Sequence, residues 1–119
     1  MKSDARTGGE ALAATLAAYE ADEPPGRSLE KAAVKHVLSL LGDRAPGKAV
    51  EVRIPPHAAI QCVEGTTHTR GTPPNVVETD ARTLLGLATG ALSWPETVRD
   101  GRVRATGTRA DLSAYLPLV

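Results

Sequence analysis

Apolar residues recur at helical spacing in the first part of the chain. Leu12, Leu16 and Tyr19 stand at positions i, i+4 and i+7, with alanines on the same face, so an amphipathic helix is predicted over residues 10–21. The Pro24-Pro25-Gly26 run ends this pattern and forms a rigid linker. The helix is expected either to cover a sheet or to pair with a second copy of the chain as a homodimer.

A second helix is predicted between residues 28 and 42. Ser28 is a good N-cap, and Gly42 is expected to end the helix as its C′ residue. The apolar stripe between them is broader than a surface helix needs, so this helix should lie at the centre of the core. Its members are Ala33, Val34, Val37, Leu38, Leu40 and Leu41.

The middle of the chain changes to the alternation that is typical of strands. Apolar and polar residues alternate most clearly from Ala49 to Ile54. Strands are predicted over residues 49–54, 58–64 and 75–79, with a short β-prone polar run at 67–70.

Local start and stop signals divide the last forty residues. Asp80 is predicted to cap a helix that ends near Gly90, and Ser93 with Glu96 forms a capping box for a short helix that reaches about residue 99. A strand over residues 102–106 follows.

The end of the chain is predicted to form one more helix. In the strand before it, Val103 and Ala105 are expected to face the core. Thr108 and Asp111 form a second capping-box pattern, and Pro117 should end the helix. The whole order predicts an α/β (α+β) fold, a mixed sheet with helices packed against it.

Composition excludes several classes of function. Fourteen basic residues balance fourteen acidic ones, which argues against a nucleic-acid-binding protein. The chain has no Phe, and its only aromatic residues besides histidine are Tyr19, Trp94 and Tyr115, so a base-stacking platform is not expected. The core should therefore be small, aliphatic and rich in alanine.

The single cysteine and the histidines give no catalytic or metal motif. Cys62 lies in a predicted strand and is expected to be a buried, inert thiol. His36, His57 and His68 lack metal-ligand spacing, so no metal or other cofactor is predicted. No apolar run is long enough to span a membrane, and the polar N-terminus does not resemble a signal peptide. A cytoplasmic protein is expected.

Several stretches of the sequence resemble one known family. The run from Thr79 to Gly90, the short helix from Ser93 and the Asp100–Gly107 segment resemble the C-terminal part of the sterol carrier protein family. The upstream stretches 51–56 and 68–80 are similar to the small actinobacterial proteins known as bacterial sterol carrier orthologues. The C-terminal domain of mycothiol-dependent maleylpyruvate isomerases is a more distant likeness.

The resemblance covers about residues 28–118 and implies a single domain over residues 1–119. Residues 1–27 would form an N-terminal helix and Pro-rich linker, and residues 28–118 the sterol-carrier-like core. It further implies a mixed, mainly antiparallel sheet of four to five strands with helices on one face, and an apolar cavity between them for a lipid tail. The aliphatic residues expected to line that cavity are Val34, Val37, Leu38, Leu41, Ile60, Val76, Leu84, Leu87 and Ala88.

Polar candidates gather in the segment from Thr66 to Asn75. His68, Arg70 and Asn75 form either an anion site, with Arg70 as a bidentate donor, or a turn whose side chains bind its own backbone. Trp94 either closes the core or stands at the mouth of the cavity.

A second group of basic residues lies near the end of the chain. Arg102 and Arg104 form either a patch for a lipid head group or an ordinary solvated strand face.

Three functions are compatible with these patterns. The first is a non-catalytic binding protein for an apolar or amphipathic small ligand, such as a lipid or fatty acyl group. The alternative is an auxiliary or interaction domain with a filled core and no lipid cavity, like the accessory domain of the isomerases. A third reading is a small enzyme that uses His68 and Arg70.

Overall fold

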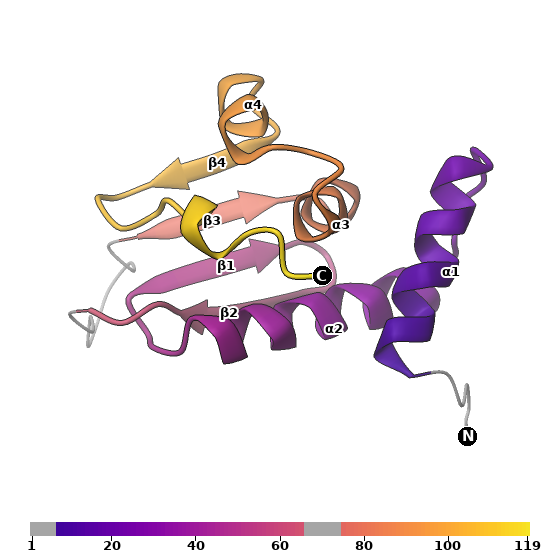
Figure 1. The fold of residues 1–119 in the computed structure, drawn as a ribbon, viewed down its shortest axis with the longest axis horizontal. Coiled ribbons are helices and arrows are strands. Elements are labelled where there is room, and N and C mark those ends of the chain that lie inside the picture. The colour runs from indigo at the N-terminus through magenta and orange to yellow at the C-terminus, as the bar shows by residue number, and fades with distance from the viewer. Residues whose placement is uncertain (1–6, 66–74) are drawn as a thin grey trace.

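The computed structural model describes residues 7–65 and 75–119, and Figure 1 shows the arrangement of their helices and strands. The elements in chain order are α1 (Gly8–Glu20), α2 (Arg27–Arg44), β1 (Val50–Ile54), β2 (Ala58–Cys62), β3 (Val76–Thr79), α3 (Ala81–Thr89), α4 (Trp94–Arg99), β4 (Val103–Thr106) and the 3-10 turn η1 (Ser113–Tyr115). The β-prone run predicted at 67–70 lies outside the described residues.

The four strands form one mixed sheet in the order β2-β1-β3-β4. β1 pairs antiparallel with β2 and parallel with β3, and β3 pairs antiparallel with β4. The predicted mixed, mainly antiparallel sheet is thereby confirmed. β2 and β4 are its edge strands, and the parallel pair lies at its centre.

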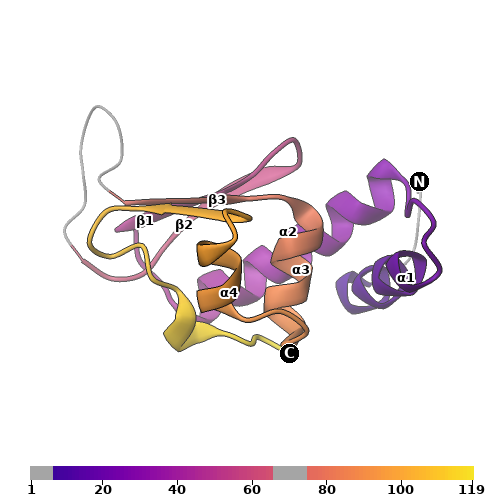
Figure 2. The same ribbon diagram turned by 90° about the horizontal axis from the view of Figure 1, so that it is seen from above.

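The helices cover one face of this sheet. Figure 2 shows α2, α3 and α4 on the same side of the strands, with α1 beyond the end of the sheet. α1 packs on α2 rather than on the strands. Strand residues that face away from the helices, such as Glu51, Arg53 and Arg104, are half-buried or exposed. No helix in the described ranges combines the length and hydrophobicity needed to cross a membrane.

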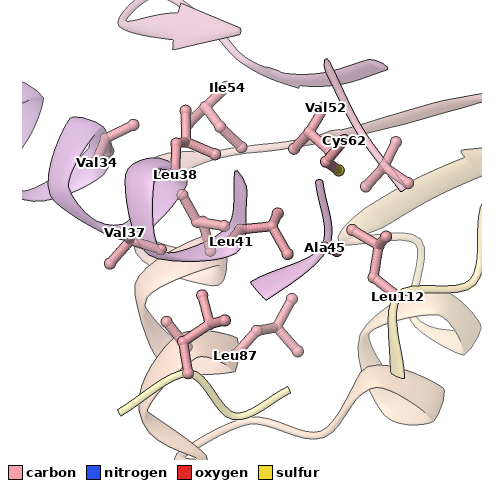
Figure 3. Packing of buried hydrophobic residues seen from close by; sticks show 14 of the residues in the cluster. Val34, Val37, Leu38, Leu41, Ala45, Val52, Ile54, Cys62, Leu87 and Leu112 are labelled. Atoms are coloured by element: carbon pink, nitrogen blue, oxygen red, sulfur yellow. The ribbon is translucent and has the colours of Figure 1, made fainter. Parts of the chain in front are cut away.

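An aliphatic core fills the space between the sheet and the helices. Val50, Val52 and Ile54 point inward from β1 and are at most 1% exposed, as their alternation predicts. They meet the apolar stripe of α2, and Figure 3 shows side chains of α2, α3 and the strands converging on one cluster. This close packing positions α3, one wall of the candidate site.

Both predicted ends of α2 are wrong. Gly26 occupies the N-cap position, with φ +88°, and no side chain caps the helix, so Ser28 is helical. The helix also continues through Gly42 to Arg44. Leu41 and Ala45 lie buried on the same side, and the Ala45 amide still donates to the Leu41 carbonyl, so packing outweighs the low helix propensity of glycine.

The predicted final helix is also wrong, because the C-terminal segment bonds to other elements instead. Only the 3-10 turn η1 forms. Asp111 accepts a hydrogen bond from the Ser113 amide, and the amides of Leu118 and Val119 both donate to the Ala88 carbonyl of α3. Those distant bonds compete with the local bonds that a helix requires.

Ala105 was predicted to face the core but is exposed in the structure. Val103 is buried as expected, but Ala105 is open to solvent although its register partner Val77 is buried. β4 is an edge strand with a neighbour on one side only, so its far end lacks cover.

Candidate functional site

The predicted cavity-lining residues, with the exception of Val76, belong to the packed core or lie against it. Those on α2 and α3 are at most 5% exposed, and Figure 3 shows several of them directed toward one another. Ile60 and Trp94 are partly buried against the same cluster. The residues on the two helices are Val34, Val37, Leu38, Leu41, Leu84, Leu87 and Ala88.

Val76 does not lie beneath these helices. It is in register with Glu51 and Thr106 on the opposite face of the sheet, and Val77 takes the buried position. None of the predicted lining residues borders the two hollows described below, so their contact with a ligand stays a prediction.

Asn75 is tied to the backbone of two neighbouring segments. Its side chain is buried, Nδ2 donates to the Ala49 carbonyl over 2.8 Å, and Oδ1 accepts from the Arg109 amide over 3.0 Å. Both bonds join Asn75 to other segments and not to the backbone of its own turn, and contact of Asn75 with a ligand stays a prediction. His68 and Arg70 lie outside the described residues, so their role as an anion site stays a prediction.

A groove of about 830 Å³ lies between α1 and α3. It is open on one side, and its size falls within the range of small-ligand sites. α1 contributes Leu16, Tyr19 and Glu20, and the α3 side contributes Asp80, Arg82, Thr83, Gly86 and Thr89. The remaining walls come from Ala91, Leu92 and Arg102.

The charged residues that α3 contributes to the groove lie at one end of the helix, and the lining residue at its other end, Thr89, is uncharged. Asp80 and Arg82 lie at the N-terminal end of this helix, whereas Gly86, Ala91 and Leu92 lie at or beyond its second half. At 1.5 Å per residue, the distance from Asp80 to Thr89 is about 14 Å. One end of the groove can therefore hold a charged group and the other a short apolar chain.

The charges at the polar end are not equivalent. The Asp80 carboxylate caps α3 by accepting from the Thr83 amide over 2.8 Å. Arg102 pairs with Asp100 over 3.0 Å. The Arg82 guanidinium lies over the ring of Tyr19, 4.8 Å from its centroid, and forms no ion pair within residues 7–65 and 75–119. Arg82 is thus the cation best placed for an anionic ligand.

Tyr19 lines the groove, and its hydroxyl bonds to a residue that lies outside the groove. Its hydroxyl donates to Glu30 Oε2 over 2.5 Å. Burial, together with this bond to a carboxylate, raises the pKa of the Tyr19 phenol well above its ordinary value. The phenol is therefore neutral at physiological pH.

A shallower hollow of about 240 Å³ lies beside β3 and β4, lined by Pro55, Glu78, Thr79, Asp80, Arg102 and Arg104. Arg104 stands opposite Glu78 in the strand register. Acidic and basic groups alternate here, which favours the reading of Arg102 and Arg104 as part of a solvated strand face over that of a head-group patch.

Within the described residues, the remaining chemistry offers neither a reactive thiol nor a metal centre. Cys62 is fully buried, and burial raises the pKa of its thiol to about 11. In the part of the chain that the structure describes, no group of three His, Cys, Asp or Glu residues could hold a metal ion.

Comparison with known proteins assigns the fold to a family. The family model described as "Bacterial SCP ortholog" matches residues 26–118, which include every described element after α1. The chain belongs to this family. No curated protein matches it. The resemblance seen in the sequence is thereby confirmed, whereas α1 lies outside the matched region of the SCP ortholog family.

The α1–α3 groove was not predicted from the sequence. It joins a helix outside the SCP ortholog match to one inside it, and these helices lie more than sixty positions apart in the chain. One local signal of the groove is present in the sequence. Gly86 is a glycine inside a segment otherwise made of residues predicted to form a helix, and it lies in the wall of the groove.

Proposed function

We propose that this protein is a non-catalytic binding protein for an amphipathic small ligand, which it holds in the groove between α1 and α3. The observation that carries the proposal is the groove itself, about 830 Å³ in volume, in which the charged residues Asp80 and Arg82 lie at the N-terminal end of α3 and Leu92 lies beyond its C-terminal end. Membership of the bacterial SCP ortholog family supports a carrier of this general kind.

The groove suggests how such a ligand would lie. Its anionic head would meet Arg82 at the N-terminal end of α3, and its apolar chain would lie against Leu16 and Leu92. Burial of each methylene group contributes about 0.8 kcal/mol. A charge-assisted hydrogen bond to the guanidinium adds orientation as well as affinity.

Displacement of a fluorescent fatty acid tests the proposal. The wild-type protein should bind the probe, and added dodecanoate should displace the probe from it. Ala91→Trp places a large ring at an exposed position of the groove wall and should weaken probe binding about tenfold or more, which corresponds to about 1.4 kcal/mol. Ala59→Trp is the matched control, because Ala59 is an exposed residue of β2 outside the groove.

Two results would overturn the proposal. One is a wild-type protein that binds no probe and yields no lipid when its organic extract is examined by mass spectrometry. The other is an Ala91→Trp variant that binds as tightly as the wild type, because the ligand would then lie elsewhere, such as between the sheet and the helices.

The second candidate is an auxiliary domain with a filled core. The complete burial of Val34, Val37, Leu38, Leu41 and Leu85 favours it, because these side chains leave the space between sheet and helices occupied. A protein that binds none of the probes would support this candidate. A homodimer through α1 and a cytoplasmic location stay predictions, and light scattering tests the first of them.

A further inference from the structure

A chain of three side chains connects the sheet to the groove. Tyr19 on α1 donates to Glu30 Oε2 on α2 over 2.5 Å, and the other carboxylate oxygen, Oε1, lies 2.8 Å from Nε2 of His57. His57 belongs to the turn between β1 and β2, where its amide donates to the Ile54 carbonyl. Its side chain is only 3% exposed.

Only one end of this chain reaches the groove. Tyr19 lines the groove and carries the Arg82 guanidinium on its ring. Glu30 and His57 do not line it. His57 does not touch the groove, so it can act on it through Glu30 and Tyr19.

We propose that His57 is a positioning residue for the groove, which acts through Glu30 to fix the ring of Tyr19 and, through that ring, the guanidinium of Arg82. This inference rests on the proposed function, because it assumes that the groove binds a ligand. It concerns the preorganisation of the site, since side chains already ordered lose less freedom when a ligand binds.

The state of Glu30 suits this role. Burial alone would raise the pKa of its carboxyl group, but the hydrogen bonds that it accepts from Tyr19 and His57 outweigh burial and hold the pKa below its ordinary value. The group is thus a carboxylate at neutral pH, with both oxygens engaged. Tyr19 and His57 then share one fixed acceptor.

The test compares two replacements of His57 in the full-length protein. In His57→Phe the ring volume remains but the hydrogen bond to Glu30 is lost, whereas the amide nitrogen of His57→Gln can take the place of Nε2. With the same fluorescent fatty acid as probe, His57→Phe should bind about three- to tenfold more weakly than the wild type. His57→Gln should recover most of that loss.

A double-mutant cycle separates positioning from general destabilisation. Tyr19→Phe removes only the hydroxyl at the groove end of the chain, so the loss of affinity in Tyr19→Phe and His57→Phe together should equal the larger single loss. Two independent destabilising effects would add instead. Circular dichroism shows whether each variant is folded at the assay temperature.

Each outcome bears on one claim. A wild-type protein that binds no probe removes the proposed function and this inference with it. If the wild type binds and a folded His57→Phe binds equally well, or if the two losses add, the inference alone is overturned. If His57→Phe does not fold, Tyr19→Phe decides: a loss of about three- to tenfold supports the inference, and unchanged affinity overturns it.

Discussion

Two helical glycines in this protein have different surroundings. A Cβ atom added to Gly42 in α2 would lie 3.9 Å from Ile60 Cδ1, an ordinary contact, whereas one added to Gly86 in α3 would lie 2.6 Å from Leu92 Cδ1. The Leu92 amide also donates to the Gly86 carbonyl over 3.0 Å. Gly86 therefore allows Leu92 to fold against α3 and form part of the groove wall.

This difference predicts opposite results for two alanine substitutions. Gly42→Ala should raise the free energy of unfolding by about 0.5–1 kcal/mol, because alanine favours the helix. Gly86→Ala should give no such gain, and it should weaken probe binding, because the methyl group pushes Leu92 toward the groove. Urea unfolding and probe titration measure both effects. A Gly86→Ala variant as stable as Gly42→Ala, with unchanged affinity, would contradict this view of the wall.

Arg82 gives a second prediction at the scale of single residues. If Arg82 holds the anionic head of the ligand, Arg82→Gln should weaken the binding of dodecanoate about tenfold. This corresponds to a loss of about 1.4 kcal/mol of binding free energy. The binding of 1-dodecanol, which has the same chain without the charge, should change little. Equal losses of affinity for the two compounds would show that Arg82 shapes the groove and does not bind the anionic head.

At the scale of elements, the local signals around α3 and α4 gave correct predictions, whereas Ser28, Gly42 and the Thr108–Asp111 pattern did not. Asp80 caps α3, Gly90 ends it in a left-handed conformation, and Ser93 caps α4. These contacts lie within a few residues of each other, so the sequence is sufficient to identify them. The C-terminal end of α2 and the form of the C-terminal segment depend on distant partners, and the sequence does not show which partners meet.

Arg44 is the clearest of these distant partners. It ends α2, and its guanidinium donates to the carbonyls of Tyr115, Pro117 and Leu118, with the shortest bond, to Pro117, 2.7 Å long. One planar side chain thus holds three backbone acceptors of the C-terminal segment. This contact lies more than seventy positions away in sequence, which explains why the predicted last helix was wrong.

Replacing Arg44 should loosen the C-terminal segment. Arg44→Met removes all three bonds and should lower the free energy of unfolding by about 1 kcal/mol, as expected for partly exposed hydrogen bonds. The free energy of unfolding of Arg44→Lys should lie between those of Arg44→Met and the wild type, because an ammonium group cannot reproduce the forked, planar donor geometry of the guanidinium. Urea unfolding measures the effect. Arg27→Met, at the exposed start of α2, is the control, and an equal loss there would contradict the assignment.

At the scale of the whole molecule, the family and the core were predictable but the groove was not. Apolar periodicity identifies which faces of α2 and β1 are buried, since each pattern needs only its own element. The groove depends on where α1 docks, and α1 lies beside the sheet rather than on it. That position is set by contacts between α1 and α2, including the hydrogen bond from Tyr19 to Glu30. The apolar periodicity of a single element does not reveal such contacts between elements.

The same bond links the stability of the molecule to pH. The pKa of Glu30 in the folded protein is below its ordinary value of 4.5, so the folded state binds the proton less tightly than the unfolded state. Its stabilising contribution is therefore fully present above about pH 4.5 and is lost as the pH falls through the lower, folded-state pKa. Because Glu30 joins α1, α2 and the β1–β2 turn, this loss should loosen all three together.

Glu30→Gln tests this linkage, because glutamine can still accept the Tyr19 hydrogen bond but does not titrate. Urea unfolding at about pH 6.5 and about pH 3.5 should show a smaller fall in the free energy of unfolding for Glu30→Gln than for the wild type. Glu23→Gln, an exposed linker variant, should follow the wild-type curve. Equal acid sensitivity in all three proteins would mean that the acid-labile contacts lie elsewhere, and that the Glu30 carboxylate does not hold α1 against the rest of the fold.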